Sequence, residues 1–299
     1  MLSDDRVVYL NGEFVPESGA TVSIRDLGFI HGDAAFDTAR TFNGKVFKLR
    51  AHLDRLYQSC KFLRIDPVVS KEGMEELTLE VVERNKPLLG PSEDYWVTQR
   101  VTRGLVSGKS GPTVLIECRP LPLAQRAHLY RDGVQLATSS MRRSPPWVLS
   151  PQAKTHNYLN VVMADMEVKS RDPEAWVVLL DEQGNLTEGA GSNVFIVKDG
   201  TIYTSRAQMV LGGITRGTAL DLARGLGLPA EERDIDLFDA YAADEMFVTA
   251  TSMCVCPAAS LNGVTIGDGK LPGPVTRRLM AAFSDTVGMD YVAQYMAHL

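Results

Sequence analysis

A lysine, a glutamate and a glycine-rich turn are the residues of this chain whose types and settings could do chemistry. Lys154 stands among mostly uncharged neighbours, Pro151 to Tyr158, directly before an apolar run, so its amine could be partly desolvated and form an imine. Glu188 lies in a turn of small residues, 187–193, which leaves room beside its carboxylate. Taken alone, Lys154 is more commonly a solvated lysine at a helix start, and Glu188 a loop acid that caps its own backbone.

The glycine-rich turn, LGGITRG at 211–217, begins a predicted helix. Its two adjacent glycines let the backbone approach a ligand, Thr215 can cap the helix, and free amides at a helix start favour an anion such as phosphate. The turn lacks the Gly-Lys-Thr and Gly-x-Gly-x-x-Gly signatures of nucleotide sites. By itself it is most simply an ordinary glycine turn with a threonine cap.

Composition limits the class of partner. The 299 residues are 44% hydrophobic and 23% charged, so the chain can bury a full core, which excludes disordered and fibrous classes. A formal net charge of -6 argues against a nucleic-acid partner. Without a secretion signal or a spanning apolar stretch, we expect a soluble cytoplasmic protein with no membrane contact. Four irregularly spaced cysteines predict reduced thiols, and Cys254 and Cys256 lack the partners of a metal site, so no metal is expected.

The first part of the chain predicts an α+β domain. Asn11-Gly12 and Asn43-Gly44 each separate two short strand-like runs, which is typical of tight two-residue hairpins. Apolar side chains at helical spacing predict helices over 50–63 and 71–85. Strands are expected over 95–102 and 113–118.

Two prolines in the stretch 119–123 disfavour both helix and central strand, so we place a connector there. Beyond it we expect strands at 133–139, 175–180, 193–197 and 245–251, and helices at 157–170, 215–225 and 274–283. The first of these helices has an apolar side formed by Leu159, Val162, Met163 and Met166. The predicted division is a small N-terminal domain of residues 1–120, a connector of 121–132 and a larger C-terminal domain of 133–299.

Taken in order, these motifs resemble the class IV (fold type IV) pyridoxal-phosphate aminotransferases. The match comprises Lys154 before Asn157, TEGAGSN at 187–193, GITR at 213–216 and DEMFVTAT at 244–251. Segments 23–29, 31–36 and 49–56 also look like family motifs, so the resemblance covers nearly the whole chain. The family includes branched-chain and D-amino-acid aminotransferases, R-selective amine transaminases and aminodeoxychorismate lyase.

The resemblance implies a two-domain α/β (α+β) fold, with a small N-terminal α+β domain and a larger α/β pseudo-barrel domain that binds pyridoxal 5'-phosphate. Lys154 would carry the cofactor as a Schiff base and shuttle the proton, while Glu188 would keep the pyridine nitrogen protonated. A homodimer or higher homo-oligomer is also implied. The remaining cofactor contacts are assigned to Arg50, Ile214, Thr215 and Thr251 for the phosphate, and to Tyr158 for the ring hydroxyl.

Substrate choice does not follow one subfamily. Thr98 takes the place of an arginine typical of branched-chain enzymes, and Ser107–Ser110 replaces the Arg-x-His pair of the D-amino-acid enzymes. Phe36, Trp96 and Trp147 predict an aromatic, apolar side-chain pocket, and His31 stands where a tyrosine is usual. The predicted substrate residues are His31, Phe36, Arg40, Thr98, Arg126 and Ser252, with Arg40 and Arg126 as candidates for the carboxylate.

The sequence thus predicts an aminotransferase that moves an amino group from an amino acid, branched-chain-like or D-amino acid, or from an R-amine, to a 2-oxo acid such as 2-oxoglutarate or pyruvate. A lyase is the main alternative, because FDTAR at 36–40 resembles the Phe-x-Thr-Ala-Arg segment of aminodeoxychorismate lyase. A non-catalytic cofactor-binding protein on the same scaffold is the second. The presence of Lys154, Glu188 and Arg50 argues against it.

Overall fold

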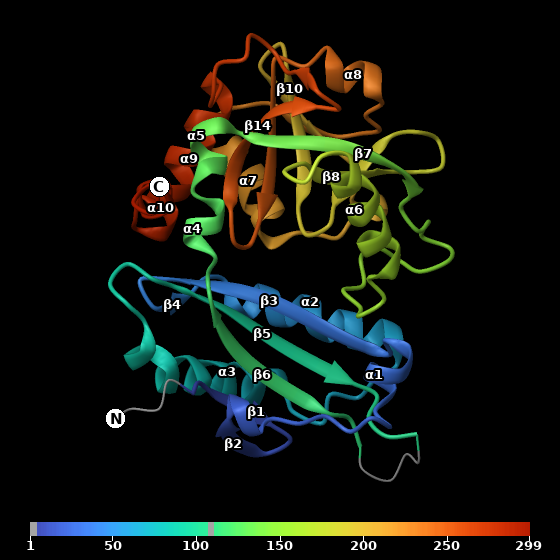
Figure 1. The fold of residues 1–299 in the computed structure, drawn as a ribbon, viewed down its shortest axis with the longest axis vertical. Helices are drawn as coiled ribbons and strands as arrows, with labels where there is room; N and C mark the ends of the chain where they lie inside the picture. Colours follow the sequence, from blue (N-terminus) through green and yellow to red (C-terminus); the bar gives the residue numbers. More distant parts are fainter. Residues whose placement is uncertain (1–4, 107–110) are drawn as a thin grey trace. The chain divides into compact units, whose positions relative to one another are not determined.

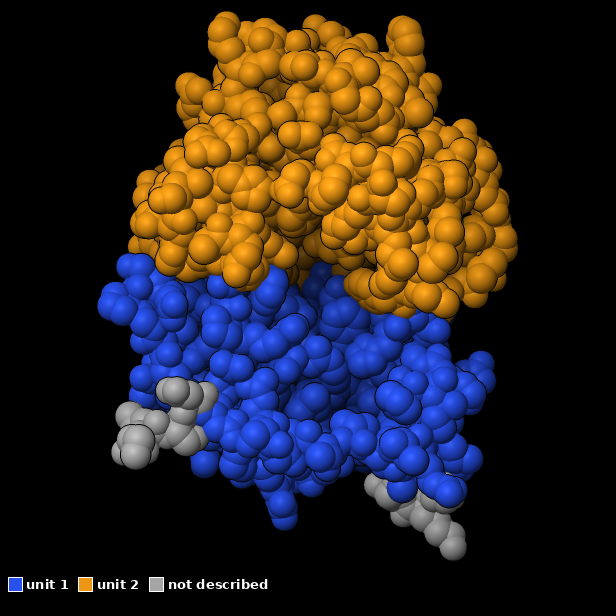
Figure 2. Space-filling view, in the orientation of Figure 1, with its two compact units in different colours: residues 1–121, 153–157 blue, residues 122–152, 158–299 orange. Residues whose placement is uncertain are grey.

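A computed structural model describes residues 5–106 and 111–299, which divide into two compact units (Figures 1 and 2). Unit 1 comprises residues 1–121 and 153–157, and unit 2 comprises 122–152 and 158–299. The division at 120 and 132 proposed from sequence stays a prediction. The segment Ser107–Ser110, considered above for substrate choice, lies outside the described residues. Within those residues, every helix is too short or too polar to cross a bilayer.

Unit 1 is built on a six-stranded antiparallel sheet with the order β2-β1-β6-β5-β3-β4. Both predicted hairpins are confirmed: Leu10 pairs with Glu13, and Phe42 with Lys45. The Asn and Gly at each turn have positive φ angles, as such tight turns require. The strands are β1 (Val7–Leu10), β2 (Glu13–Pro16), β3 (Ala34–Phe42), β4 (Lys45–Val46), β5 (Tyr95–Thr102) and β6 (Val114–Pro120).

Two long helices pack on one face of this sheet. They are α2 (Leu49–Leu63) and α3 (Lys71–Asn85), close to the predicted ranges, and α1 (Leu27–His31) is a single short turn. Their core contacts include Leu53 and Leu56 of α2, Met74 of α3 and Ile116 of β6. Because side chains alternate along a strand, the other face of the sheet is left for residues such as Phe36 and Thr38.

Unit 2 contains a nine-stranded sheet in which six strands close into a ring, β10-β13-β14-β7-β8-β9 and back to β10. The pairing of Glu188 with Asn193 completes the ring. This confirms the predicted α/β pseudo-barrel. The ring strands are β7 (Val134–Arg142), β8 (Trp176–Leu180), β9 (Leu186–Gly189), β10 (Asn193–Lys198), β13 (Glu245–Ala250) and β14 (Cys254–Leu261); β11 (Thr201–Thr204), β12 (Ala230–Glu232) and β15 (Val264–Thr265) extend it.

Helices surround this ring (Figure 1). The longest, α9, begins at Pro274, where the Glu245 carboxylate accepts hydrogen bonds from the amides of Val275 and Thr276. An acid is well suited to this end of a helix dipole. The helices are α4 (Leu123–Arg126), α5 (His128–Asp132), α6 (Leu159–Arg171), α7 (Ile214–Gly225), α8 (Leu237–Tyr241), α9 (Pro274–Val287) and α10 (Tyr291–Met296).

The apolar side of α6 seen in the sequence is not the side that is buried. Leu159, Val162, Met163 and Met166 do share one side, but that side is exposed, with Leu159 at 71% and Met166 at 61%. The buried residues of the helix are instead Val161, Ala164 and Val168, which pack with residues of β8. The small Ala164 and the two β-branched valines let the helix approach the sheet closely. Because the larger apolar residues lie on the other side, α6 carries apolar residues on both sides.

Replacing Asn85, at the end of α3, should measurably lower the stability of the protein. Its amide group accepts from the Val7 amide at 2.9 Å and donates to the Val7 carbonyl at 2.7 Å. Asn85→Ala would leave these backbone groups without partners, so the free energy of unfolding should fall by about 2 to 3 kcal/mol in urea titrations. Lys71→Ala, which removes only an exposed pair with Asp54, should leave the midpoint nearly unchanged. Equal stability of both variants would contradict this account.

Candidate active site

A buried carboxylate ties α2 to β3 in unit 1. Asp37 accepts from the Nε of Arg55 and from its second guanidinium nitrogen, each at 2.7 Å, and lies 2.7 Å from the Nδ1 of His52. His52 and Arg55 lie one turn apart on α2, so both reach the same strand. Asp37 is fully buried, and its pairing with an arginine fork satisfies the charge.

The charges of this cluster follow from its surroundings. Burial alone would raise the pKa of Asp37, but the Arg55 guanidinium and the His52 hydrogen bond outweigh burial and hold that pKa below its usual range. Burial lowers the pKa of His52, which its bond to Asp37 only partly offsets. An ionised carboxylate can only accept, so a neutral His52 must donate from Nδ1.

Lys154 is held within unit 1 by its backbone. Its carbonyl accepts from the Phe36 amide at 3.0 Å, and its amide donates to the Oγ of Ser59 on α2, also at 3.0 Å. Ser59 in turn donates to the carbonyl of Arg55. The Lys154 amine lies 4.4 Å from the centre of the Phe36 ring. The lysine is therefore fixed against both β3 and α2 in a defined position.

The face of β3 and β5 that points away from α2 carries several of the predicted substrate residues. Thr38 and Thr98 are cross-strand partners whose hydroxyls lie 3.1 Å apart. Phe36 and Arg40 occupy the same face of β3, since they lie two residues on either side of Thr38. Beside Phe36, burial and the Arg100 charge lower the pKa of His156 to about 4, so its imidazole is neutral at pH 7.

Glu188 is a buried acid in unit 2. One carboxylate oxygen accepts from the Nε of Arg143 at 2.9 Å, and the other accepts from the Leu211 amide at 3.0 Å. Leu211 also receives a bond from the Asn193 side chain at its carbonyl. These contacts place Glu188 directly beside the glycine-rich turn that the sequence singled out.

The glycine-rich turn leads into α7, whose first residues are the predicted phosphate ligands Ile214 and Thr215. Gly213 stands at the N-cap without a side-chain cap, so these amides are offered by the helix start itself. A side chain at position 213 would collide with the Asn193 amide, which explains the glycine. Asn193 pairs with Thr249, two residues before Thr251, so all three phosphate candidates of unit 2 belong to one region.

Other predicted residues of unit 2 lie on nearby elements. Arg126, in α4, donates to the Oγ of Ser252 and lies 5.3 Å from the centre of the Trp176 ring. Ser252 follows Thr251 directly, in the turn between β13 and β14. Tyr158 begins α6 and packs with its buried residues.

Two predicted residues of unit 1 are exposed. Arg50 points outward from α2, with its side chain 80% exposed and paired with Glu75. His31 is exposed at the end of α1. Arg55, which was not among the predicted site residues, is buried beside Asp37, and its carbonyl accepts a hydrogen bond from the serine that holds Lys154. Its register with Leu56, His52 and Ser59 on the buried side of α2 is the signal that could have identified it.

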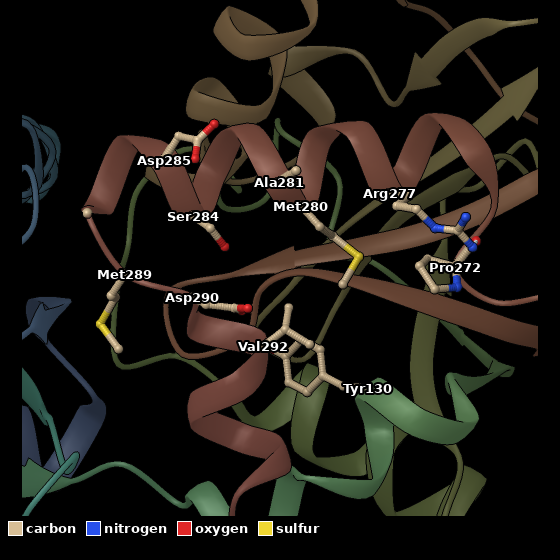
Figure 3. A pocket seen from close by; sticks show the side chains of 11 residues that line it. Tyr130, Pro272, Arg277, Met280, Ala281, Ser284, Asp285, Met289, Asp290 and Val292 are labelled. Atoms are coloured by element: carbon tan, nitrogen blue, oxygen red, sulfur yellow. Dashed lines mark hydrogen bonds between the residues drawn. The ribbon is translucent and has the colours of Figure 1, made fainter.

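A cavity of about 700 Å³ lies elsewhere in unit 2, against α9 and the start of α10 (Figure 3). Met280, Met289 and Val292 supply much of its apolar lining, and Tyr130 forms one wall. None of the predicted site residues lines it. The cavity is therefore not the place where the candidate residues gather.

Comparison with known proteins identifies the family of the chain. The family model for amino-transferase class IV matches residues 34–261. A provisionally named branched-chain-amino-acid aminotransferase of Methanocaldococcus jannaschii is 38% identical over 285 residues, covering 93% of this chain and 95% of that protein. The D-alanine aminotransferase of Bacillus licheniformis is 32% identical over 285 residues, covering 94% of this chain and 96% of that protein.

A solved structure shows the same arrangement of the fold. The branched-chain amino acid aminotransferase of T.th., solved with pyridoxamine 5'-phosphate, matches with a TM-score of 0.86 and 29% identity, covering 95% of each chain. The family match, the relatives and this structure all extend over both units. The chain therefore belongs to the class IV aminotransferases and is a transaminase, which transfers an amino group from an amino acid to a 2-oxo acid.

Proposed function

We propose that the chain uses pyridoxal 5'-phosphate, bound through Lys154, to transfer the amino group of an L-branched-chain amino acid to 2-oxoglutarate. The observation that carries the proposal is the fixed position of Lys154, whose backbone is bonded on both sides and whose amine lies over an aromatic ring. A structurally similar branched-chain enzyme with pyridoxamine 5'-phosphate supports the cofactor. The relative named as a branched-chain aminotransferase and the apolar ring of Phe36 support a branched-chain amino acid as the amino donor.

The residues of unit 2 fit the charges of this cofactor. Glu188 offers a buried carboxylate for the pyridine nitrogen, held on one side by Arg143 and on the other by the Leu211 amide. The uncapped start of α7 suits a phosphate dianion, with Ile214 and Thr215 donating amides. The buried Thr249 hydroxyl has no hydrogen-bond partner within the described chain, which leaves a polar atom near Thr251 for a ligand. Tyr158 is proposed for the ring hydroxyl.

The cofactor, when bound, supplies an electron sink for the carbon that bears the amino group. The chain's own contribution is then proton transfer and charge placement. Lys154 is proposed to act first as a base that takes the proton from that carbon and then as an acid that delivers it on the cofactor side of the amino nitrogen. Glu188 is proposed to keep a proton on the ring nitrogen of the same cofactor.

We propose that substrate recognition divides between two groups of residues. Phe36 and Thr98 share one face of the unit 1 sheet, where they are proposed to contact a small aliphatic side chain of the substrate. Arg40 lies on the same face, but its buried guanidinium pairs with Asp94 at 3.7 Å and donates to the Thr41 carbonyl, so it is not proposed for the carboxylate.

Ser252 and Arg126 are proposed for the substrate carboxylate, since a guanidinium suits that group. His31 is exposed and is proposed to contribute from the partner subunit of a homodimer.

The exposed face of α6 supports the homodimer. Leu159, Val162, Met163 and Met166 form an apolar stripe over two helical turns. Exposed apolar stripes of this kind on otherwise polar surfaces mark protein interfaces. A second copy of the chain, which family resemblance makes the expected partner, is proposed to cover it.

Purified protein with L-leucine and 2-oxoglutarate should release glutamate. Lys154→Ala should abolish the shift in the absorption band of added cofactor that Schiff-base formation with the lysine produces, and it should lower the transfer rate at least about 1000-fold, because the variant loses its proton-transfer group. Lys86→Ala, which removes an exposed lysine on the surface of unit 1, serves as the control and should match the wild type.

An intact cofactor spectrum and rate in Lys154→Ala would refute the role of the lysine. Faster glutamate or alanine release from D-amino acids than from L-leucine would instead overturn the proposed donor while leaving the cofactor role in place.

Substitutions of Arg55 and of Arg50 should have different effects on the binding of the cofactor phosphate. We propose that Arg55, buried and aligned by Asp37, takes the role that the sequence suggested for Arg50. Arg55→Lys should weaken cofactor affinity about 10-fold or more, since the ammonium lacks the planar fork. Arg50→Lys should leave affinity nearly unchanged. Fluorescence titration of both apoproteins decides the matter, and the reverse order would restore the assignment to Arg50.

The α6 stripe is tested by placing a charge on its last residue, Met166. Met166→Glu should raise the dimer dissociation constant about 10-fold or more, as measured by analytical ultracentrifugation, because a charge would be buried in an apolar contact. Val264→Glu places the same charge on β15, where the native side chain is also exposed, and should leave the dimer intact. An unaltered dimer in Met166→Glu means that another surface forms it.

A further inference from the structure

Three buried tyrosines donate hydrogen bonds to the backbone of one short turn of unit 2 and of the strand that follows it. The turn joins β13 to β14 and contains Thr251 and Ser252. Tyr295 donates to the carbonyl of Ser252 at 2.5 Å, and Tyr130 donates to that of Met253 at 2.5 Å. A third hydroxyl, from Tyr291, donates to the carbonyl of Val255 at 2.8 Å, at the start of β14.

The three rings form one cluster, so their hydroxyls have fixed relative positions. Tyr130 comes from α5, whereas Tyr291 and Tyr295 come from the C-terminal helix α10. The ring of Tyr130 lies 4.7 Å from that of Tyr295 and 5.9 Å from that of Tyr291. Phe283 of α9 adds an edge contact to Tyr291. All are buried, which makes each hydroxyl bond costly to lose.

Fixing a carbonyl also fixes the rest of its peptide group. Because the peptide is planar, the bond to the Ser252 carbonyl sets the direction of the Met253 amide on the opposite side. The Ser252 hydroxyl is fixed as well, since it accepts from Arg126. Backbone and side chain of the turn are thus both determined by residues from α4, α5 and α10.

We propose that Tyr295, with Tyr130, is a positioning residue that holds the Thr251–Ser252 turn in the orientation required to bind cofactor phosphate and substrate carboxylate. This inference rests on the proposed function, which assigns Thr251 and Ser252 to those groups. It gives the C-terminal helix, which contributes none of the predicted site residues, a role in the reaction.

Tyr295→Phe tests the role because it removes one hydroxyl and retains the ring. The dissociation constant for pyridoxal phosphate and the KM for the amino acid should each rise about 3- to 10-fold, the worth of one hydrogen bond, while kcat changes little. Tyr130→Phe should act in the same direction and provides a second variant if the first does not fold. Circular dichroism checks that each variant is folded.

Tyr95→Phe is the matched control. Tyr95 is also buried and donates to a backbone carbonyl, that of Asn85 at 2.8 Å, but in unit 1. It should lower the melting temperature as Tyr295→Phe does, without changing the dissociation constant or KM. If Tyr295→Phe and Tyr130→Phe also lower only the melting temperature, the tyrosines are merely structural and the inference fails. A wild-type protein that does not bind the cofactor would refute the proposed function instead.

Discussion

The buried pairing of Asp37 with Arg55 is the interaction on which the arrangement of unit 1 depends. Burying a lone carboxylate is costly, and here the Arg55 fork and His52, both on the facing helix, satisfy it. The pair therefore fixes the register of α2 against β3, which also brings Ser59 to the Lys154 amide. The position of Lys154, which lies far along the chain, therefore depends on the Asp37 carboxylate in β3.

Closure of the ring plays the corresponding part in unit 2. Glu188 belongs to the pair that completes it, and its partner Asn193 also contacts the glycine-rich turn and pairs with Thr249. One asparagine thus connects the acid, the start of α7 and the strand that leads to Thr251. The tyrosine cluster then holds the turn that follows this strand, through the carbonyls of Ser252 and Met253.

Most local structure could be predicted from the sequence because it depends on near neighbours. Asn-Gly pairs determine the hairpins through positive φ angles, and apolar periodicity determined α2 and α3 almost to the residue. The order of the motifs around Lys154, Glu188 and Gly213 was enough to indicate the family. The residues that define a turn or a motif are neighbours in the sequence, so the sequence alone is enough to predict them.

Which side of a helix is buried was decided only by tertiary structure. In α6 the larger apolar residues lie outside, and Val161, Ala164 and Val168 face the sheet, because close packing favours small and branched side chains there. In α2, Arg55 is buried because it pairs with Asp37, whereas Arg50 is exposed. Asp37 lies outside the helix, so the helix sequence alone does not show which arginine is buried. The sequence by itself determined the elements and the family, while the partner of each side chain came from strands and helices that only folding brings together.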